Sequence, residues 1–425
     1  MAGELTGADR RDAGRAIDAV WRIESARVIG GLARLVHDIG WAEDLAQDAL
    51  VAALEQWPRS GIPDNPGAWL MATGKHRAID QLRRRQMAER RHEQLGRDQE
   101  RDPAPAGGDL DAQLDDQIGD DLLGLLFATC HPVLSPSARA ALTLRLFGGL
   151  STAEIARAFL VSEATVAQRV VRAKRALAEA RVPLGVPAPD ELGPQLASVL
   201  EVIYLIFNEG YAATTGEHWM RPALSEDALR VGRIVAELLP GEAEVHGLVA
   251  LMEIQQSRAR ARQGPAGEPV LLLDQDRSRW DRRLIARGLA ALARAERLGG
   301  MLGPYGLQAE IAACHARAVT AEQTDWIRIV ALYDALVQLS PSPVVALNRA
   351  VAVSMAFGPH AALELVDALS AEPLLAAYHL LPSVRADLLT RLGRTAEARD
   401  ELVRAASLTQ NASEQRLLAQ RAERL

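Results

Sequence analysis

The sequence contains few of the residues that disulfide frameworks, thiolate metal sites and aromatic-rich cores require. Of its 425 residues only two are cysteines, Cys130 and Cys314, and Phe, Trp and Tyr together make up 4%. Two cysteines so far apart in sequence can form neither a disulfide framework nor a four-thiolate zinc site. We therefore expect two buried, reduced thiols and no bound metal.

Long apolar runs are also missing. No stretch reaches the roughly 18 apolar residues that span a bilayer, and the longest candidates, such as 199–207, are too short. Residues 1–11 mix charges of both signs and lack the apolar centre of a signal peptide. These absences predict a soluble, cytoplasmic protein that does not associate with membranes.

Motifs for catalysis are absent as well. The sequence contains no Gly-rich phosphate loop, no nucleophile elbow and no His-Glu-x-x-His zinc motif. Asp274 and Asp276 resemble the start of a calcium loop, but the glycine and the terminal glutamate of such a loop are missing. The sequence therefore predicts no catalytic residues, no cofactor and no enzymatic activity.

The charge balance is acidic, with 48 basic and 55 acidic residues and a net charge of −7. Contact with nucleic acid would therefore need a local basic surface, because the molecule as a whole repels polyanions. Ala, Leu and Arg recur throughout, and apolar residues are spaced three and four apart, which indicates amphipathic helices. We expect an all-α fold.

Composition divides the chain into segments. Between residues 98 and 121 there are nine acidic residues and one basic residue, together with Pro103, Pro105 and three glycines, which is typical of a flexible linker. Four prolines between 182 and 194 mark a second break. The predicted domains are a helical domain at 15–95, an acidic linker at 96–121, a second helical domain at 122–182 and a C-terminal domain at 190–425.

We predict three helices in the first domain and a cluster of basic residues at its C-terminal end. The helices run from about 16 to 37, from about 42 to just before Pro58, and from Pro66 into Arg85, with Pro66 in a good first-turn position. Residues 75–91 hold seven basic and two acidic side chains. This cluster could neutralise several phosphates; the alternative is a solvated helix end.

The second domain contains a predicted helix-turn-helix. Ser151 and Glu154 form a capping box for the first helix, and Ser162 caps the second after a turn at Leu160 and Val161. The second helix buries Val166, Val170 and Leu177. Its other face carries the short polar and basic side chains that a helix in the major groove requires, although an ordinary helical hairpin with basic faces is the alternative. The predicted DNA-binding residues are Thr165, Gln168, Arg169, Arg172, Lys174 and Arg175.

Together these blocks resemble the extracytoplasmic-function (ECF) sigma factors of bacterial RNA polymerase, over about 17–85 and 122–180. The segments that carry the resemblance are AEDLAQDA at 42–49, NPGAWLM at 65–71, RAIDQLRRR at 77–85 and the helix-turn-helix. The resemblance implies that region 2 docks on the polymerase β′ coiled coil and reads the −10 promoter element. It also implies that region 4 reads the −35 element and touches the β flap.

Site residues of region 2 follow from the same resemblance. It places His76 where the family often has Asn, which is a departure next to the strand-melting segment. The alternative for Trp69 is a place in the hydrophobic core. We expect Asp80 to form an ion pair with a neighbouring arginine of the same chain. The resemblance assigns polymerase binding to Glu43, Asp44, Gln47 and Asp48, and −10 recognition to Asn65, Trp69, Lys75, Arg77, Arg83 and Arg84.

Beyond region 4 the chain continues for more than two hundred residues, and as a whole it resembles the ECF subgroup with a large C-terminal domain of tetratricopeptide (TPR)-like repeats. The supporting segments are YLIFNEGY at 204–211, DQDRSRW at 274–280 and SPVVALNRA at 342–350. Independently, a Gly-x-x-Ala motif at Gly358 recurs at Gly393, near the 34-residue TPR period. Asn208, Glu209 and Tyr211 read as a helix-end hydrogen-bond network.

Three functional hypotheses remain at this point. The first is a sigma factor that binds RNA polymerase core and promoter DNA, with activity modulated by a C-terminal solenoid that binds a cytosolic regulatory protein. The second is a one-component helix-turn-helix regulator that acts without polymerase core. The third is an interaction scaffold whose solenoid alone matters.

Overall fold

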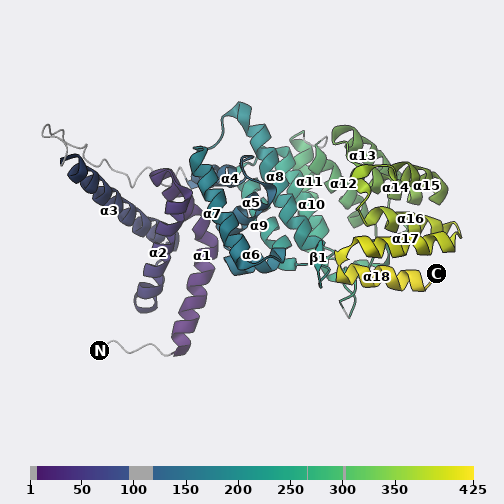
Figure 1. Cartoon of the computed structure of the whole chain (residues 1–425), viewed down its shortest axis with the longest axis horizontal. Helices are drawn as coiled ribbons and strands as arrows, with labels where there is room; N and C mark the ends of the chain where they lie inside the picture. Colours follow the sequence, from purple (N-terminus) through teal and green to yellow (C-terminus); the bar gives the residue numbers. More distant parts are fainter. Residues whose placement is uncertain (1–6, 95–117, 266, 300–302) are drawn as a thin grey trace. The chain divides into compact units, whose positions relative to one another are not determined.

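The computed structural model describes residues 7–94, 118–265, 267–299 and 303–425, and most of these residues are helical (Figure 1). They form 18 α-helices, four short 3₁₀ helices and a two-stranded sheet of two residues per strand. The all-α prediction is therefore confirmed. The chain divides into two compact units, residues 1–202 and 203–425.

The first unit begins with three helices that pack on each other, α1 against α2 and α3, and α2 against α3. Their core contains Ile17, Leu32, Leu45 and Leu70. Gly74 lies so close to Leu32 that a Cβ there would sit 2.8 Å from a Leu32 methyl group, which explains how tightly α3 approaches α1. The three helices are α1 (Gly7–Val36), α2 (Ile39–Ser60) and α3 (Pro66–Gln94).

Helix α2 departs from the prediction at its C-terminal end. It continues through Pro58 to Ser60, where we expected it to stop before the proline. Proline has no backbone N–H and therefore removes one helical hydrogen bond. Only two residues of α2 follow Pro58, so little of the helix lies beyond this interruption. Gly61 ends the helix with a positive φ of 83° and donates its N–H to the Trp57 carbonyl.

Four shorter helices follow and bury a second group of apolar side chains, among them Leu125, Leu142, Ile155 and Val166. Helix α4 starts inside the segment that we predicted as linker, and the rest of that linker, 96–117, lies outside the described residues. Asp120 and Asp121 lie in the first turn of α4, where negative side chains interact favourably with the helix dipole. The helices are α4 (Ile118–Thr129), α5 (Pro136–Leu146), α6 (Thr152–Phe159) and α7 (Glu163–Glu179).

Helix α8 (Pro189–Tyr211) begins inside the Pro-rich break that we predicted at 182–194. Its first half belongs to the first unit and contacts α4 and α5 through Ser198. The Ser198 hydroxyl donates to the Cys130 carbonyl at 2.6 Å and accepts from Arg139 at 2.6 Å. Both Cys130 and Cys314 are buried and free, as the sequence predicted.

The second unit is a succession of helices in which most pack on their neighbours in sequence, while α12 packs mainly on α10. The green and yellow part of Figure 1 shows this succession. Four 3₁₀ helices lie between them, at Ala259–Ala261, Leu272–Asp274, Arg277–Arg279 and Pro373–Leu375. The α-helices are α9 (Pro222–Leu238), α10 (Ala243–Gln256), α11 (Arg282–Arg297), α12 (Pro304–Arg317), α13 (Trp326–Leu339), α14 (Pro343–Phe357), α15 (Pro359–Leu369), α16 (Leu380–Arg391), α17 (Thr395–Leu408) and α18 (Ala412–Glu423).

The two repeated glycines hold equivalent places in this succession. Gly358 separates α14 from α15, and Gly393 lies in the turn between α16 and α17. Both have positive φ angles, 95° and 77°, which glycine adopts without the steric penalty of a Cβ. Each helix pair packs closely on itself and α15 packs on α16, so the sequence repeat corresponds to a repeated helix pair.

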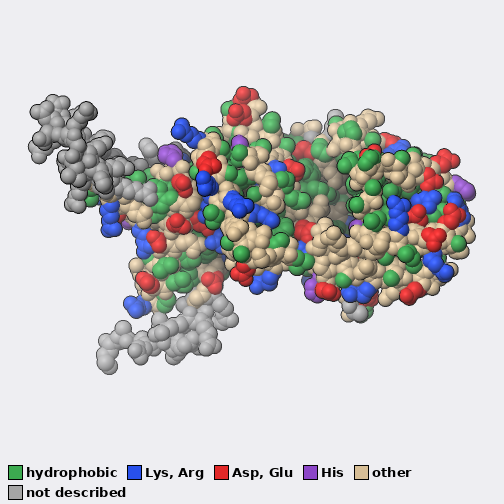
Figure 2. Space-filling view, viewed as in Figure 1, with side chains coloured by type: hydrophobic (Ala, Val, Ile, Leu, Met, Phe, Trp, Pro, Cys, Tyr) green, Lys and Arg blue, Asp and Glu red, His purple; other side chains and the backbone are tan. Residues whose placement is uncertain are grey.

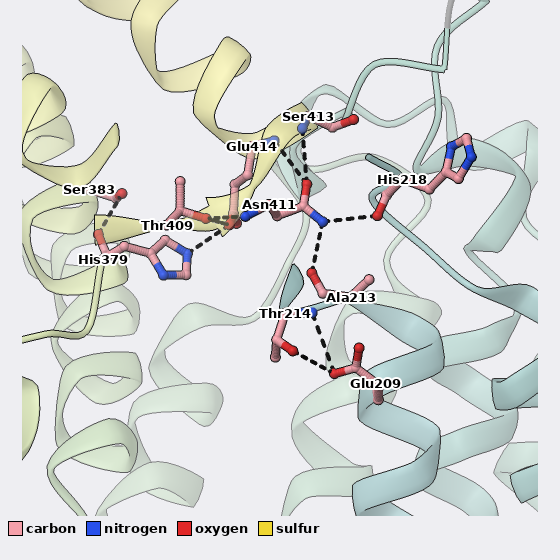
Figure 3. Close-up of polar contacts among 10 residues, drawn as sticks. All are labelled: Glu209, Ala213, Thr214, His218, His379, Ser383, Thr409, Asn411, Ser413 and Glu414. Carbon is pink, nitrogen blue, oxygen red and sulfur yellow. Dashed lines mark hydrogen bonds and ion pairs between the residues drawn. The ribbon is translucent and has the colours of Figure 1, made fainter. Parts of the chain in front are cut away.

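The end of the chain is bound to the loop that follows α8 (Figure 3). Strands β1 (Thr215–Gly216) and β2 (Gln410–Asn411) pair in parallel. Asn411, which is 1% exposed, donates to the Ala213 carbonyl at 3.0 Å and to the His218 carbonyl at 2.9 Å. Its Oδ1 accepts from the first amides of α18, and the Ser413 hydroxyl donates to the Glu217 carbonyl at 2.7 Å.

The predicted network at the end of α8 is present. Glu209 accepts a hydrogen bond from the Thr214 hydroxyl at 2.8 Å and forms an ion pair with Arg221. The Tyr211 hydroxyl accepts from Arg258 at 2.7 Å, and Asn208 hydrogen-bonds the side chain of Tyr204. These residues therefore fix the C-terminal end of α8 and the loop after it.

Candidate nucleic-acid interface

Helices α6 and α7 form the helix-turn-helix with the caps that the sequence predicted. The Ser151 hydroxyl accepts from the Glu154 amide at 3.2 Å, and the Glu154 carboxylate accepts from the Ser151 amide at 2.8 Å. The hydrogen bonds that the Ser151 amide and hydroxyl donate to the Glu154 carboxylate lower the pKa of Glu154. Leu160 ends α6 with φ of 51°, and Ser162 caps α7 by accepting from the Thr165 amide at 3.1 Å.

Helix α7 has one buried face and one solvent face. Val166, Val170 and Leu177 are buried, as predicted. Thr165, Gln168, Arg172 and Arg175 are exposed, whereas Arg169 and Lys174 are half-buried. Arg175 pairs with Glu179 at 2.6 Å on the surface.

A groove runs beside the solvent face of α7. It has a volume of about 400 Å³ and lies between α7 and the segment that connects α4 to α5. In the first unit, Figure 2 shows basic side chains on the surface near α7. Four of the predicted DNA-binding residues line the groove, namely Thr165, Gln168, Arg169 and Arg172.

The predicted polymerase-binding residues differ in their exposure to solvent. Asp44 is exposed, and Gln47 and Asp48 are half-exposed. Glu43 is only 5% exposed. It faces α5 and α7, where its carboxylate pairs with Arg145 at 2.9 Å and with Lys174.

The Glu43 carboxylate is held in its ionised form by these two cations. Burial alone would raise the pKa of Glu43, but the charges and hydrogen bonds of Lys174 and Arg145 outweigh it and lower the pKa. A second ion pair, Arg34 with Asp121 at 3.0 Å, joins α1 to α4. At the same place Gly30 packs so closely that an added Cβ would lie 2.8 Å from the Asp121 carbonyl oxygen.

The residues predicted for −10 recognition lie along α3 and at its start. Asn65 is exposed and its side chain accepts from the Ala68 amide at 3.0 Å, which caps the helix. Trp69 is half-buried and packs edge-to-face on Trp57, with ring centroids 5.3 Å apart. Trp69 therefore belongs partly to the core and partly to the surface.

Further along α3 the basic side chains reach solvent. Arg77 pairs with Asp48 of α2 at 3.4 Å, and Lys75 is half-buried. Arg83 and Arg84 are exposed. Asp80 is exposed and forms no ion pair with the described side chains, so its pairing with a neighbouring arginine stays a prediction.

Family models match most of the chain in three consecutive blocks. Residues 22–87 match sigma-70 region 2, and residues 125–177 match sigma-70 region 4. Residues 195–296 match a family of unknown function, DUF6596. The first two matches coincide with α1–α3 and with the helices that carry the helix-turn-helix.

Similar proteins agree with this division. The ECF RNA polymerase sigma factor SigK of Mycobacterium ulcerans is 29% identical over 158 residues, which are 36% of this chain and 78% of SigK. The SigK of Mycolicibacterium vanbaalenii is 29% identical over 172 residues, 40% of this chain and 82% of that protein. This chain belongs to the ECF sigma factors and carries a C-terminal extension.

The extension is shared with a relative over nearly full length. The uncharacterized protein R00370 of Rhizobium meliloti is 43% identical over 396 residues, 91% of this chain and 90% of the relative. No solved structure matches the chain. The resemblance that the sequence motifs indicated is confirmed for this ECF sigma factor, and RNA polymerase core and promoter DNA are the partners that its two sigma regions imply.

Sigma factors are non-enzymatic proteins that recognise DNA. Among the described residues, no three His, Cys, Asp or Glu side chains converge as metal ligands. None of the described helices is both long enough and apolar enough for a bilayer span.

Two features of the site were not predicted from the sequence. Arg145 was not singled out, yet it pairs with Glu43 across 102 positions of sequence. Asp121 was assigned to the acidic linker, yet it is 7% exposed and paired with Arg34. The signal for Asp121 was the apolar run LLGLLFA that follows it, which indicates a helix start.

Proposed function

We propose that this ECF sigma factor reads the −35 promoter element with α7 and the −10 element with α3. The observation that carries the proposal is the solvent face of α7. There a doubly capped helix-turn-helix presents Thr165, Gln168 and Arg172 beside a groove. Side chains of this kind bond base edges in the major groove, while arginines further along the helix bind phosphate.

For the −10 element, the proposal assigns phosphate contacts to Arg83 and Arg84, which extend from α3 into solvent. Asn65 and Trp69 lie at the other end of this helix, and the partly exposed Trp69 ring is available for contact with a base. Base stacking on an aromatic ring is the usual way in which proteins hold unpaired bases. Lys75 and Arg77 lie between these two ends.

We further propose that α2 docks on the β′ coiled coil of polymerase and that region 4 touches the β flap. Asp44, Gln47 and Asp48 are accessible for this contact. Glu43 is bound to Arg145 and Lys174 of region 4, so docking through Glu43 requires that these ion pairs break. On this proposal, separation of region 2 from region 4 frees Glu43 for polymerase and Lys174 for DNA together.

The C-terminal extension is proposed to modulate this activity through TPR-like helix pairs that bind a regulatory protein. The support is the repeated helix pair around Gly358 and Gly393, since stacked helix pairs of this kind form extended protein-binding surfaces. A cytosolic partner fits the absence of a bilayer-length apolar segment among the described helices.

Run-off transcription tests the whole proposal. Purified protein and polymerase core, supplied with fragmented genomic DNA, are expected to yield transcripts that start at a small set of promoters. A protein that holds DNA but neither co-purifies with core nor supports transcription would instead be a one-component regulator. Removal of residues 190–425 is expected to change the amount of transcript and leave the promoter choice intact, whereas a scaffold would lose all function.

A further inference from the structure

One stretch of the C-terminal unit concentrates arginine. Between residues 258 and 283 there are seven, and in the described part of the chain none forms an ion pair with a carboxylate. Elsewhere in this unit arginines are commonly paired, as Arg385 is with Asp367 and Glu401, and in Figure 2 basic and acidic side chains alternate over α15–α17. The seven are Arg258, Arg260, Arg262, Arg277, Arg279, Arg282 and Arg283.

Three of these arginines are buried and packed among aromatic rings. The Arg262 guanidinium lies 3.5 Å from the Tyr211 ring centroid, and Arg258 hydrogen-bonds the Tyr211 hydroxyl at 2.7 Å. Arg277 lies 4.9 Å from the Trp280 ring centroid and donates to the carbonyls of residues 315 and 318. Aromatic faces and carbonyls solvate these cations without neutralising them.

The titration of neighbouring groups reflects this excess of positive charge. Burial, followed in size by the charge of Arg258, lowers the pKa of Arg277, with Glu322 acting in the opposite direction. Burial, together with the charges of Arg258 and Arg277, lowers the pKa of His315 to about 3, which keeps that ring neutral. Burial also lowers the pKa of Arg262 to about 10.

The other four arginines line a surface pocket of about 780 Å³. A pocket of this size falls within the roughly 300–1,000 Å³ that small-ligand sites occupy. Gln263, Ser278 and Trp280 contribute to the same wall. Arg260, Arg279, Arg282 and Arg283 are all exposed, so their guanidinium groups are accessible.

Two carboxylates near this pocket, those of Asp281 and Asp276, accept hydrogen bonds from neighbouring residues, and a third, that of Glu268, lies beside Gly264 of the lining. Asp281 caps α11 by accepting from the amides of Arg283 at 2.9 Å and Leu284 at 3.2 Å. Asp276 accepts from the amide and the hydroxyl of Ser278, at 2.9 and 2.6 Å. The amides at the start of α11 are therefore satisfied, and the arginine side chains remain as the donors that a ligand would meet.

The backbone beneath these arginines is fixed. Trp280 is 3% exposed, with Arg258 and Arg277 packed against its ring. The Asp281 amide donates to the Ser257 carbonyl at 2.8 Å, which joins the start of α11 to the end of α10. A rigid support lowers the entropy that the arginines lose when they close on a ligand.

We propose that this pocket binds a small molecule that carries two or more phosphate charges, such as diphosphate or a nucleoside polyphosphate. Arginine presents a planar fork of donors that matches phosphate oxygens in pairs. Four accessible guanidinium groups around one pocket require several negative charges for neutralisation, which favours a polyphosphate over a single carboxylate. The inference goes beyond sigma-factor activity, because it gives the extension a small-molecule ligand.

The test is calorimetric titration of the full-length protein with diphosphate, ATP and inorganic phosphate in separate experiments. We expect saturable binding of diphosphate, and at least a tenfold loss of affinity in the double variant Arg282→Ala with Arg283→Ala. Arg297→Ala is the matched control, since Arg297 is exposed on the same helix but lies outside the pocket. It should bind like the unaltered protein. Tighter binding of ATP than of diphosphate would show that the nucleoside adds contacts, and equal binding would show that the phosphates suffice.

The double variant with lysine, Arg282→Lys and Arg283→Lys, keeps the charge and guards against a folding defect. We expect it to bind diphosphate with an affinity between those of the unaltered protein and the alanine variant, because lysine lacks the paired donors. Equal affinities in all these proteins, no saturable binding of diphosphate or ATP, or binding of DNA alone would each overturn the proposal. The titration contains no polymerase, so its failure would leave the proposed transcription activity standing.

Discussion

Glu43 of α2 and Lys174 of α7 form an ion pair that joins the sigma region 2 helices to the helix-turn-helix of region 4. Arg145 of α5 completes the contact at 2.9 Å from the same carboxylate. The Glu43 side chain is 6% exposed, so water and salt ions weaken the attraction between the two charges little on the Glu43 side. Two residues for which the sequence predicts different partners, polymerase for Glu43 and DNA for Lys174, thus bind each other in this structure.

Replacement of Lys174 should loosen this contact. Lys174→Ala leaves the buried Glu43 with Arg145 as its ion-pair partner among the described residues. We expect the free energy of unfolding to fall by about 1–3 kcal/mol, because one partner of a half-buried pair is removed. Arg175→Ala is the control, since Arg175 pairs with Glu179 on the exposed face of the same helix. Hydrogen exchange of α2 and α7 measures the effect, and equal protection in both variants would contradict the prediction.

The same pair predicts a dependence on pH. The folded-state pKa of Glu43 lies below its usual value near 4.5, so the pair stabilises the protein fully above that value. The contribution is lost as the pH falls from about 4.5 through the lower folded-state pKa. We therefore expect the stability difference between the unaltered protein and Glu43→Gln to be constant at neutral pH and to shrink in acid. Urea unfolding at a series of pH values measures it, and a difference independent of pH would exclude the ion pair as its source.

Promoter binding should depend on the groove arginines of α7. Arg169→Ala and Arg172→Ala are each expected to weaken binding of −35 DNA and to reduce the slope of log affinity against log salt by about one, because each removes one phosphate-neutralising charge. Arg394→Ala, an exposed and ion-paired arginine of the C-terminal unit, provides the comparison. Fluorescence anisotropy at several salt concentrations gives both quantities. An unchanged slope in the α7 variants would argue against their contact with DNA.

The attachment of α18 should depend on Asn411. Asn411→Ala removes the donor of two hydrogen bonds and leaves the carbonyls of Ala213 and His218 without this partner. We expect the free energy of unfolding to fall by about 2–4 kcal/mol. Gln410→Ala changes the exposed neighbour in the same strand and should cost less than about 0.5 kcal/mol. Denaturant unfolding measures the two costs. Similar values for both variants would show that the Asn411 amide contributes little.

Local signals in the sequence predicted the helix-turn-helix well. The caps of α6 and α7 depend on residues only three positions apart, Ser151 with Glu154 and Ser162 with Thr165. Such contacts are encoded in a short window of sequence, and the buried positions Val166 and Val170 follow from helical period alone. The all-α fold and the family resemblance rest on the same kind of information.

Contacts between distant segments were beyond this reasoning. The pair of Arg145 with Glu43 depends on how two separate helical groups meet, and nothing near either residue encodes that meeting. The buried arginines Arg258 and Arg277 were not singled out, because composition does not show which cations aromatic rings will cover. Pro58 was read as a stop, although a helix tolerates proline where few further hydrogen bonds depend on it.

The attachment of β2 to β1 changes how the C-terminal unit should respond to shortening. In an open array of repeats, removal of the last helix exposes one interface and leaves the others intact. Here the last helix also holds the loop between α8 and α9 through Asn411 and Ser413. A stop codon before residue 410 would therefore disturb two places at once, so nested deletions from this end should produce an abrupt loss of folding rather than a graded one.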